Sequence, residues 1–404
     1  MAKLVAEKAD SPRISLILLG AISFMVIADM RVIDPLLRVI ANEFGTSVGY
    51  TAVIISAYTI PYGLFQLVYG PLGDRIGKLK VMTFAIAIFA VGTVACAFVP
   101  SLPLLILLRF LTGIFAAGII PLSLAYIGDN FPYAERQTAI GRYLSSLMLG
   151  QILSSSLGGI FGEYLSWRDI FLLFGIASMG IAFIFWQGTK QYHLQPKSTE
   201  AESGYALLKP YWQLINQSAV RLVITTVFIE GFFLFGSYAY MGAFIRDRYH
   251  LPYITIGVLL SGFGIGGLLY SASVKLLVRR LGESGLVLVG GSLVFICYLS
   301  ISLFKSWLLF IPGTIFSGLG FYMFHSTLQT RATEMSPESR GTAVSLFAFN
   351  LFLGQGIGAA AIGRIVDNFG YIPAFILSGT AIVLLAVWFV NKSRHFKNEY
   401  WRSH

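Results

Sequence analysis

Long apolar segments alternate with short polar ones along almost the whole chain. Each apolar segment holds about the 20 residues that a helix needs to cross the hydrocarbon core of a bilayer. The predicted spans are residues 14–40, 48–71, 79–99, 103–127, 137–164, 169–189, 219–245, 254–278, 284–304, 307–332, 339–366 and 371–391. The pattern therefore predicts an all-α membrane protein with twelve transmembrane helices.

A polar stretch divides these spans into two sets of six. We predict an N-terminal six-helix half (1–189), a cytoplasmic linker (190–217) and a C-terminal six-helix half (218–404). A shift of 204 residues lays 136–163 on 340–367 with eight of the 28 positions identical, and it aligns Glu163 with Asp367. Repeats that run in the same direction are related by an axis along the membrane normal, with a binding site between them. The sequence thus predicts two pseudo-symmetric halves and a site at their junction.

The composition fits a bilayer better than water. Hydrophobic residues make up 56% of the chain and charged residues 12%, with a mean hydropathy of +0.74. Soluble domains carry about twice that charge. With both termini inside, 21 of the 29 Lys and Arg residues fall on the inner side. The positive-inside rule then predicts a multi-pass protein of the inner (plasma) membrane with cytoplasmic termini. The net charge of +10 reflects this asymmetry and predicts no nucleic-acid partner.

A short charged segment rich in glycine separates the second and third spans. Residues 69–82 read YGPLGDRIGKLKVM. Glycines let helix ends approach closely, and the basic residues hold the segment inside. Asp74, the one acid, is expected to accept hydrogen bonds from an Arg or from free N–H groups that begin another helix. Such a contact can hold one conformation and open in another. The predicted gating residues are Gly70, Gly73, Asp74, Arg75, Gly77 and Lys78, with Arg136 and Arg340 at the starts of spans five and eleven.

This segment resembles the loop signature of the major facilitator superfamily, Gly-x-Leu-x-Asp-Arg-x-Gly-Arg/Lys. Leu72, Asp74, Arg75, Gly77 and Lys78 fit that pattern. A second segment, LLRFLTGIFAAG (107–118), resembles the fourth span of the family through its arginine, Arg109. The stretch DMRVIDPLLRVIANEFGTS is similar to the twelve-span drug–proton antiporter branch. The resemblance implies the major facilitator fold and transport by alternating access.

One segment departs from the antiporter pattern. Antiporters of this family often carry Gly-x-x-x-Gly-Pro-x-x-Gly-Gly in span five, and this chain reads GQILSSSLGG. Gly150, Gly158 and Gly159 are kept, but Ser154 and Ser155 replace Gly-Pro. The sequence therefore leaves antiport, symport and uniport open.

Charged residues at membrane depth are costly and usually have a partner or a function. Asp29 lies roughly 22 Å from the inner face by helical rise, and Arg109 lies at a similar depth in span four. They could pair or share a polar network, and three interpretations stay open: a proton switch, a static ion pair, and no contact. Asp34, a further proton-coupling candidate, is expected to pair with Arg38 at i,i+4. Arg31 is expected to reach outward or to pair with an acid on another span.

The second half carries one deep acid, Glu230, within FIEGFFLFGSYAY. A carboxylate near Phe233 and Tyr238 favours a cationic or aromatic substrate, through charge and cation–π contact. The alternative is a Glu bonded to a neighbouring helix. The other predicted substrate-binding residues are polar or aromatic residues of spans two, five, ten and eleven: Tyr62, Gln151, Tyr322, His325 and Gln355.

These features predict a secondary active transporter for proton-coupled efflux of a small amphipathic or cationic compound. The alternatives are export of a sugar or metabolite, proton-coupled uptake, and a membrane receptor or scaffold. No nucleophile–base pair, zinc spacing or phosphate loop is evident, so we expect no enzyme, cofactor or metal. The expected partners are a small-molecule substrate, protons and the lipid bilayer, with the chain acting as a monomer.

Overall fold

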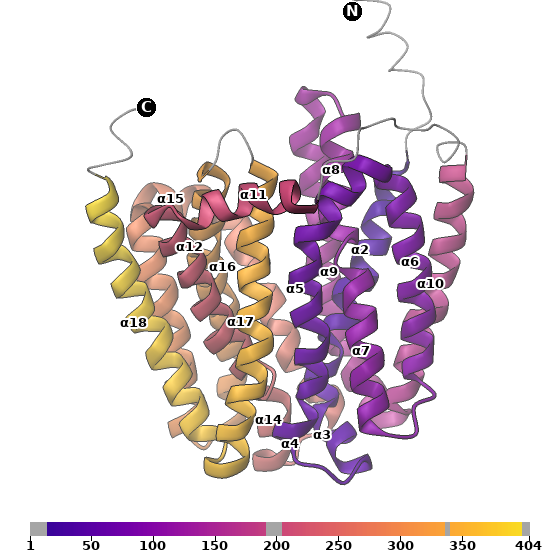
Figure 1. The fold of residues 1–404 in the computed structure, drawn as a ribbon. Helices are drawn as coiled ribbons and strands as arrows, with labels where there is room; N and C mark the ends of the chain where they lie inside the picture. Colours follow the sequence, from indigo (N-terminus) through magenta and orange to yellow (C-terminus); the bar gives the residue numbers. More distant parts are fainter. Residues whose placement is uncertain (1–13, 191–203, 336–339, 398–404) are drawn as a thin grey trace, which may run out of the picture.

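The computed structural model describes residues 14–190, 204–335 and 340–397, and all regular structure within these ranges is helical. The first half of the chain forms helices that run alternately up and down (Figure 1). Their bounds are α2 Leu16–Arg31, α3 Ile33–Glu43, α4 Val48–Thr51, α5 Val53–Ile76, α6 Lys78–Cys96, α7 Leu102–Ala116, α8 Ile119–Asn130, α9 Tyr133–Tyr164 and α10 Trp167–Thr189.

Before the second half comes α11 (Gly204–Ile215), a helix within the predicted linker that runs along the top of the molecule in Figure 1. The elements that follow α11 form the second group of spans. They are α12 Ser218–Glu230, a π-helical turn η2 Gly231–Phe235, α13 Gly236–Tyr238, α14 Met241–Tyr249, α15 Tyr253–Leu303, a 3-10 turn η3 Trp307–Leu309, α16 Phe310–Glu334, α17 Arg340–Phe369 and α18 Tyr371–Lys397.

The described helices confirm the predicted all-α membrane fold. Ten are long and apolar enough to cross a bilayer, and eleven if α2 and α3, bent by 44°, form one span. The 51-residue α15 is about 76 Å long at 1.5 Å per residue, more than twice the hydrocarbon thickness of roughly 30 Å. Gly282 interrupts it with a φ of 62° and a ψ of 177°. Counting the parts on either side of Gly282 as separate spans gives the twelve that the sequence predicts.

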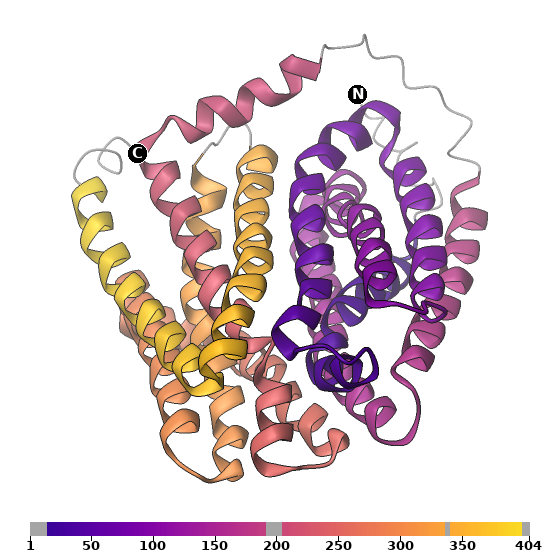
Figure 2. The same ribbon diagram turned by 60° about the horizontal axis from the view of Figure 1, so that its bottom comes forward.

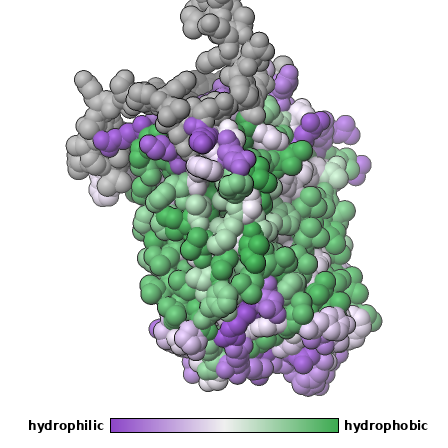
Figure 3. Space-filling view, turned by 90° about the vertical axis from the view of Figure 1, so that its right-hand side faces the viewer, coloured by the Kyte–Doolittle hydropathy of each residue, from purple (hydrophilic) through white to green (hydrophobic). Residues whose placement is uncertain are grey.

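The polar residues gather at the two ends of the bundle. Figure 3 shows a broad apolar band between two polar rims, as expected for a protein surrounded by lipid. We call the end with α11 and the α5–α6 connection the near end, and the end with α4 and the α14–α15 connection the far end; they are the top and bottom of Figure 1. The start of α2 and the end of α18 both lie toward the near end.

The two halves lie side by side and touch along two helix pairs, α5 with α17 and α9 with α15 (Figures 1 and 2). The repeated segments, α9 and α17, are thus the helices that each half presents to the other. Glycines allow the closest approach: a Cβ on Gly159 of α9 would lie 2.4 Å from the Tyr253 carbonyl oxygen of α15. The same helices that resemble each other in sequence therefore occupy equivalent places in the fold.

Candidate transport site

A buried ion pair joins the first and fourth spans. Arg109 Nη1 on α7 donates to Asp29 Oδ2 on α2 at 2.6 Å, and Nη2 donates to the Asp29 carbonyl oxygen at 3.2 Å. Both side chains are buried, and the guanidinium lies 4.2 Å from the ring centre of Tyr58. Asp29 Oδ1 has no hydrogen-bond partner among the described residues. One carboxylate oxygen is therefore held by the cation and the other remains an available acceptor.

Local packing fixes the position of Arg109. The helix α7 touches α5 at Gly113, where a Cβ would lie 2.3 Å from the Tyr58 carbonyl oxygen. Gly113 is four residues after Arg109, so this contact holds the arginine against the Tyr58 ring on one side. Matched depth predicted that Asp29 and Arg109 would pair, and the structure shows the pair. Its role in proton coupling stays a prediction.

The next charges along the first span have other partners than the sequence predicts. Arg38 bonds through Nε to Asp247 Oδ1 of α14 at 2.9 Å, so the expected Asp34–Arg38 pair is wrong. Asp34 instead lies 4.0 Å from Arg31. Asp34 and Arg38 lie one turn apart on the same helix, α3, but the fold brings Asp247 of the other half to Arg38, a contact that helical spacing does not reveal. Arg31 does not reach outward: it is buried, with its guanidinium 4.3 Å from the Phe235 ring centre of the other half.

The deep acid of the second half also has a partner. Glu230 ends α12, and its Oε2 lies 2.8 Å from His325 Nδ1 on α16. The His325 ring stacks on Phe321 at a centroid distance of 4.7 Å. Glu230 is fully buried, and its Oε1 has no hydrogen-bond partner among the described residues. The sequence named Glu230 and His325 separately, and the structure brings them together.

The aromatic candidates beside Glu230 are packed within the second half. Tyr238 donates its hydroxyl hydrogen to the Leu260 carbonyl oxygen at 2.7 Å. Phe233 packs against Phe232 at a centroid distance of 4.9 Å, and Tyr322 against Phe321 at 5.0 Å. Tyr322 therefore lies next to the His325 stack, whereas the Tyr238 hydroxyl is already satisfied by the backbone.

Three further candidates lie on the helices that join the halves. Tyr62 of α5 meets Phe352 of α17 edge-on at 4.6 Å. Gln355 of α17 is buried, and its Oε1 has no hydrogen-bond partner in the described part of the chain. Gln151 of α9 is partly buried, and its carbonyl oxygen accepts from the Ser154 hydroxyl at 3.1 Å. Tyr62 and Gln355 thus belong to the α5–α17 contact, and Gln151 to α9.

The predicted gating segment is shorter than expected. The helix α5 runs to Ile76 and α6 begins at Lys78, so Gly77 alone connects them, with a φ of 106° that favours glycine. Asp74 lies 3.2 Å from Lys78, which also pairs with Asp129 of α8. Asp74 therefore bonds a lysine of its own segment, and not an arginine or another helix start as predicted.

The remaining gating candidates differ in how tightly they pack. A Cβ on Gly73 would lie 2.3 Å from Leu122 Cδ2, whereas one on Gly70 would meet nothing within 4 Å. Arg136 donates from Nη2 to the Phe131 carbonyl oxygen at 3.4 Å. The side chains of Arg340 and of the predicted linker residues 191–209 lie outside the described residues.

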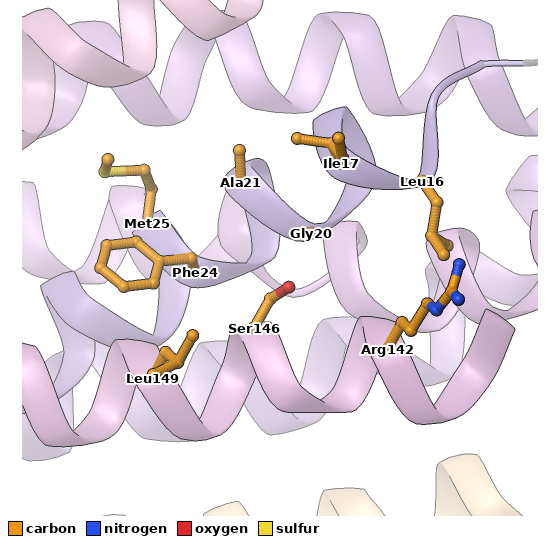
Figure 4. A pocket seen from close by; sticks show the side chains of 9 residues that line it. All are labelled: Leu16, Ile17, Gly20, Ala21, Phe24, Met25, Arg142, Ser146 and Leu149. Atoms are coloured by element: carbon orange, nitrogen blue, oxygen red, sulfur yellow. The ribbon is translucent and has the colours of Figure 1, made fainter. Parts of the chain in front are cut away.

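Sequence reasoning missed an open pocket between α2 and α9. It has a volume of about 430 Å³ and is apolar except for Arg142 and Ser146 on α9 (Figure 4). Gly20 is one of its lining residues, and α2 approaches α9 closely there, since a Cβ on Gly20 would lie 2.5 Å from Ser146 Oγ. The apolar side of α2 that faces it reads as ordinary lipid-facing sequence, so no signal in the chain marked it.

A helical bundle in two repeated halves, with buried charges in each half, has the architecture of a membrane transporter. The family model described as Major Facilitator Superfamily matches residues 19–359. The chain belongs to the major facilitator superfamily. The inner membrane transport protein YnfM of Escherichia coli is 24% identical over 92% of this chain and 89% of that protein. The multi-drug resistance efflux pump PmrA of Streptococcus pneumoniae is 24% identical over 89% of this chain and 91% of that protein.

The solved structures agree on the fold. The crystal structure of a bacterial homolog to the human lysosomal transporter Spinster, described as inward-facing and unoccupied, superposes with a TM-score of 0.77 at 19% identity. The match covers 95% of this chain and 97% of that one. The family match over residues 19–359 confirms, at the level of the family, the resemblance seen in residues 70–82 and in the fourth span.

Proposed function

We propose that this transporter couples proton entry to export of a small amphipathic compound, with preference for cations. The observation that carries the proposal is the buried Asp29–Arg109 pair, in which one carboxylate oxygen is held by the cation and the other is without a partner. An acid beside a cation stays charged, and it takes up a proton once the cation moves away in a dry site. Relative motion of α2 and α7 during transport would thus load and release one proton.

The contacts between the halves support an inward-facing arrangement. At the far end Arg38 bonds Asp247 and Ser47 bonds Asp367, both across the junction. By the positive-inside rule the far end faces outward, so the described state is closed to the outside. At the near end Lys78 pairs with Asp129 inside its own half, and we assign this contact and Asp74 to holding the α5–α6 corner rigid as the halves rock.

The substrate preference rests on the second half. Glu230 Oε1, unpaired among the described residues, is the acceptor that we assign to a cationic group. The Phe321–His325 stack and Tyr322 supply aromatic faces nearby. PmrA, named a multi-drug resistance efflux pump, lends support to export of such compounds.

The test uses purified protein in proteoliposomes with an imposed pH gradient. Ethidium, a lipophilic cation, is the probe, and a neutral dye of similar size is the comparison. Wild type should move ethidium against its gradient in exchange for protons. Glu230→Gln should weaken ethidium transport about tenfold or more and spare the neutral dye, whereas Glu43→Gln, at a far-end ion pair with Arg168, should leave both unchanged. Movement of neither probe under any gradient would contradict the proposal.

A further inference from the structure

The repeated helices α9 and α17 end in two acids that occupy equivalent positions. Glu163 Oε2 accepts the backbone N–H of Tyr253 at 2.6 Å. Asp367 Oδ1 accepts the backbone N–H of Gly49 at 2.9 Å, and its Oδ2 accepts the Ser47 hydroxyl at 2.6 Å. The 204-residue shift that relates the halves also aligns these two acids. Each half therefore sends one carboxylate to the backbone of the other.

Each carboxylate binds where a long span of the opposite half begins. Tyr253 is the first residue of α15, and Gly49 is the second residue of the span Val48–Ile76. The first N–H groups of a helix have no partner within the helix, and the helix dipole makes them attract negative charge. The two contacts therefore combine a charge-assisted hydrogen bond with a favourable charge–dipole interaction.

Gly159 and Gly363 lie one helical turn before Glu163 and Asp367, and they allow the two halves to come close enough for the acids to reach their partners. A Cβ on Gly159 would lie 3.0 Å from Gly257 Cα, and a Cβ on Gly49 would lie 2.3 Å from the Gly363 carbonyl oxygen. The backbones of the two halves touch at both places, which leaves no room for even a methyl group. The contacts can exist only while the far end is closed.

The near end is built differently. There Lys78 pairs with Asp129 within the first half, and Arg331 pairs with Glu283 at 3.0 Å within the second half. The ion pairs found at that end of the described chain do not join the halves, so they do not resist its opening. The charge-assisted contacts between the halves therefore lie at the far end, where they favour the conformation in which that end is closed.

We propose that Glu163 and Asp367 are two latches that hold the far end of the transporter closed. They act as positioning residues: they touch backbone of the opposite half, and they lose these partners to water when the far end opens. The inference rests on alternating access, which the family implies, and not on the proposed proton coupling or substrate. Because the latches share no partner, their effects on the closed state should multiply.

The experiment measures the far-end distance directly in nanodiscs. Spin labels are placed at Asn42→Cys and Lys305→Cys, which are exposed at the far end on opposite halves, after Cys96 and Cys297 are replaced by alanine. Pulsed electron–electron double resonance then gives the populations of short and long distances between the two labels. The measurement needs neither substrate nor a proton gradient, so its result is separate from that of the transport assay.

Neutral amides replace the acids in the test variants. Glu163→Gln and Asp367→Asn should each raise the ratio of long to short distances about fivefold, a change of about 1 kcal/mol, and the double variant about 25-fold. The control is Asp169→Asn: Asp169 Oδ2 also accepts a backbone N–H at the far end, from Ser166 at 2.9 Å, but within its own half. That variant should lower the melting temperature and leave the distances unchanged.

Two outcomes would overturn the inference. If both latch variants have a lower melting temperature, as Asp169→Asn does, and keep the wild-type distances, then Glu163 and Asp367 only stabilise the fold. If only one acid shifts the distances, the paired latch is wrong. Ser47→Ala guards against a variant that fails to fold, because it removes one bond to Asp367 and keeps the acid. It should shift the distances in the same direction by a smaller factor.

Discussion

Removing Arg109 should destabilise the protein more than removing the whole Asp29–Arg109 pair. In Arg109→Gln the Asp29 carboxylate stays in a fully buried position and loses the cation 2.6 Å from its Oδ2. Breaking a buried ion pair from one side costs about 3–5 kcal/mol, because an uncompensated charge remains. The carboxylate can escape that cost only by taking up a proton. Near pH 7 this protonation costs about 4 kcal/mol for an aspartic acid, whose reference pKa is about 3.9.

The stability of Arg109→Gln should depend on pH, because Asp29 must take up a proton in the folded variant. Since the folded variant binds a proton that the unfolded chain releases, its stability should fall as pH rises, by about 1.4 kcal/mol per unit between pH 6 and 8. Asp29→Asn/Arg109→Gln has no charge to bury, so its stability relative to wild type should change little with pH. The double variant should also melt at a higher temperature than Arg109→Gln at pH 8.

The assay is thermal unfolding in detergent at pH 6, 7 and 8, followed by the fluorescence of a thiol-reactive dye that reports exposure of the buried Cys96 and Cys297. An Arg109→Gln variant that melts at or above the temperature of the double variant at pH 8 would show that Asp29 is not left as a buried, unpaired charge. The same conclusion would follow if the melting temperature of Arg109→Gln lay equally far below that of the double variant at all three pH values, because Asp29 would then not be the group left without a partner.

Three further predictions concern packing, topology and the charged corner. Gly49→Ala should hold the far end open and slow transport at least tenfold, because its Cβ would overlap the Gly363 carbonyl oxygen. The control Gly180→Ala should transport normally, since nothing lies within 4 Å of a Cβ there, and equal activity of the two variants would contradict this contact. A cysteine at Lys305 should react with an impermeant thiol reagent only from outside and one at Arg279 only from the cytoplasm, and labelling of both from one side would overturn the topology. Asp74→Ala should slow turnover while substrate affinity stays within about tenfold, because Asp74 contacts Lys78 and not solute; normal turnover would remove Asp74 from the gate.

The sequence predicted the helices well because span length is fixed by the bilayer. Twenty apolar residues between polar breaks leave few alternatives to a transmembrane helix. It also predicted the Asp29–Arg109 contact, because two deep charges of opposite sign at one depth are costly apart. The repeat located α9 and α17, the helices that join the halves.

Other features depend on geometry that the sequence does not carry. Asp34 and Arg38 share α3, so helical spacing allowed the predicted pair, but Asp247 of the other half lies 2.9 Å from Arg38, and a contact between halves cannot be read from spacing along one helix. Glu230 and His325 lie at different depths when residues are counted from predicted span ends, yet the two side chains meet at 2.8 Å. Asp74 meets Lys78 because α5 continues to Ile76 and α6 begins at Lys78, directly after Gly77. Helix boundaries are the part of a structure that a sequence predicts least precisely, so this partner was missed.

The most direct test of the account is simultaneous measurement of proton and substrate flux in proteoliposomes for wild type and Asp29→Asn. Asn at this position mimics the protonated acid and cannot release a proton. If Asp29 carries the coupling proton, Asp29→Asn should show no proton flux and no accumulation of ethidium against its gradient, while exchange of ethidium for ethidium continues. If Asp29→Asn still accumulates ethidium with proton counterflow, Asp29 is a structural partner of Arg109 and the coupling site lies elsewhere.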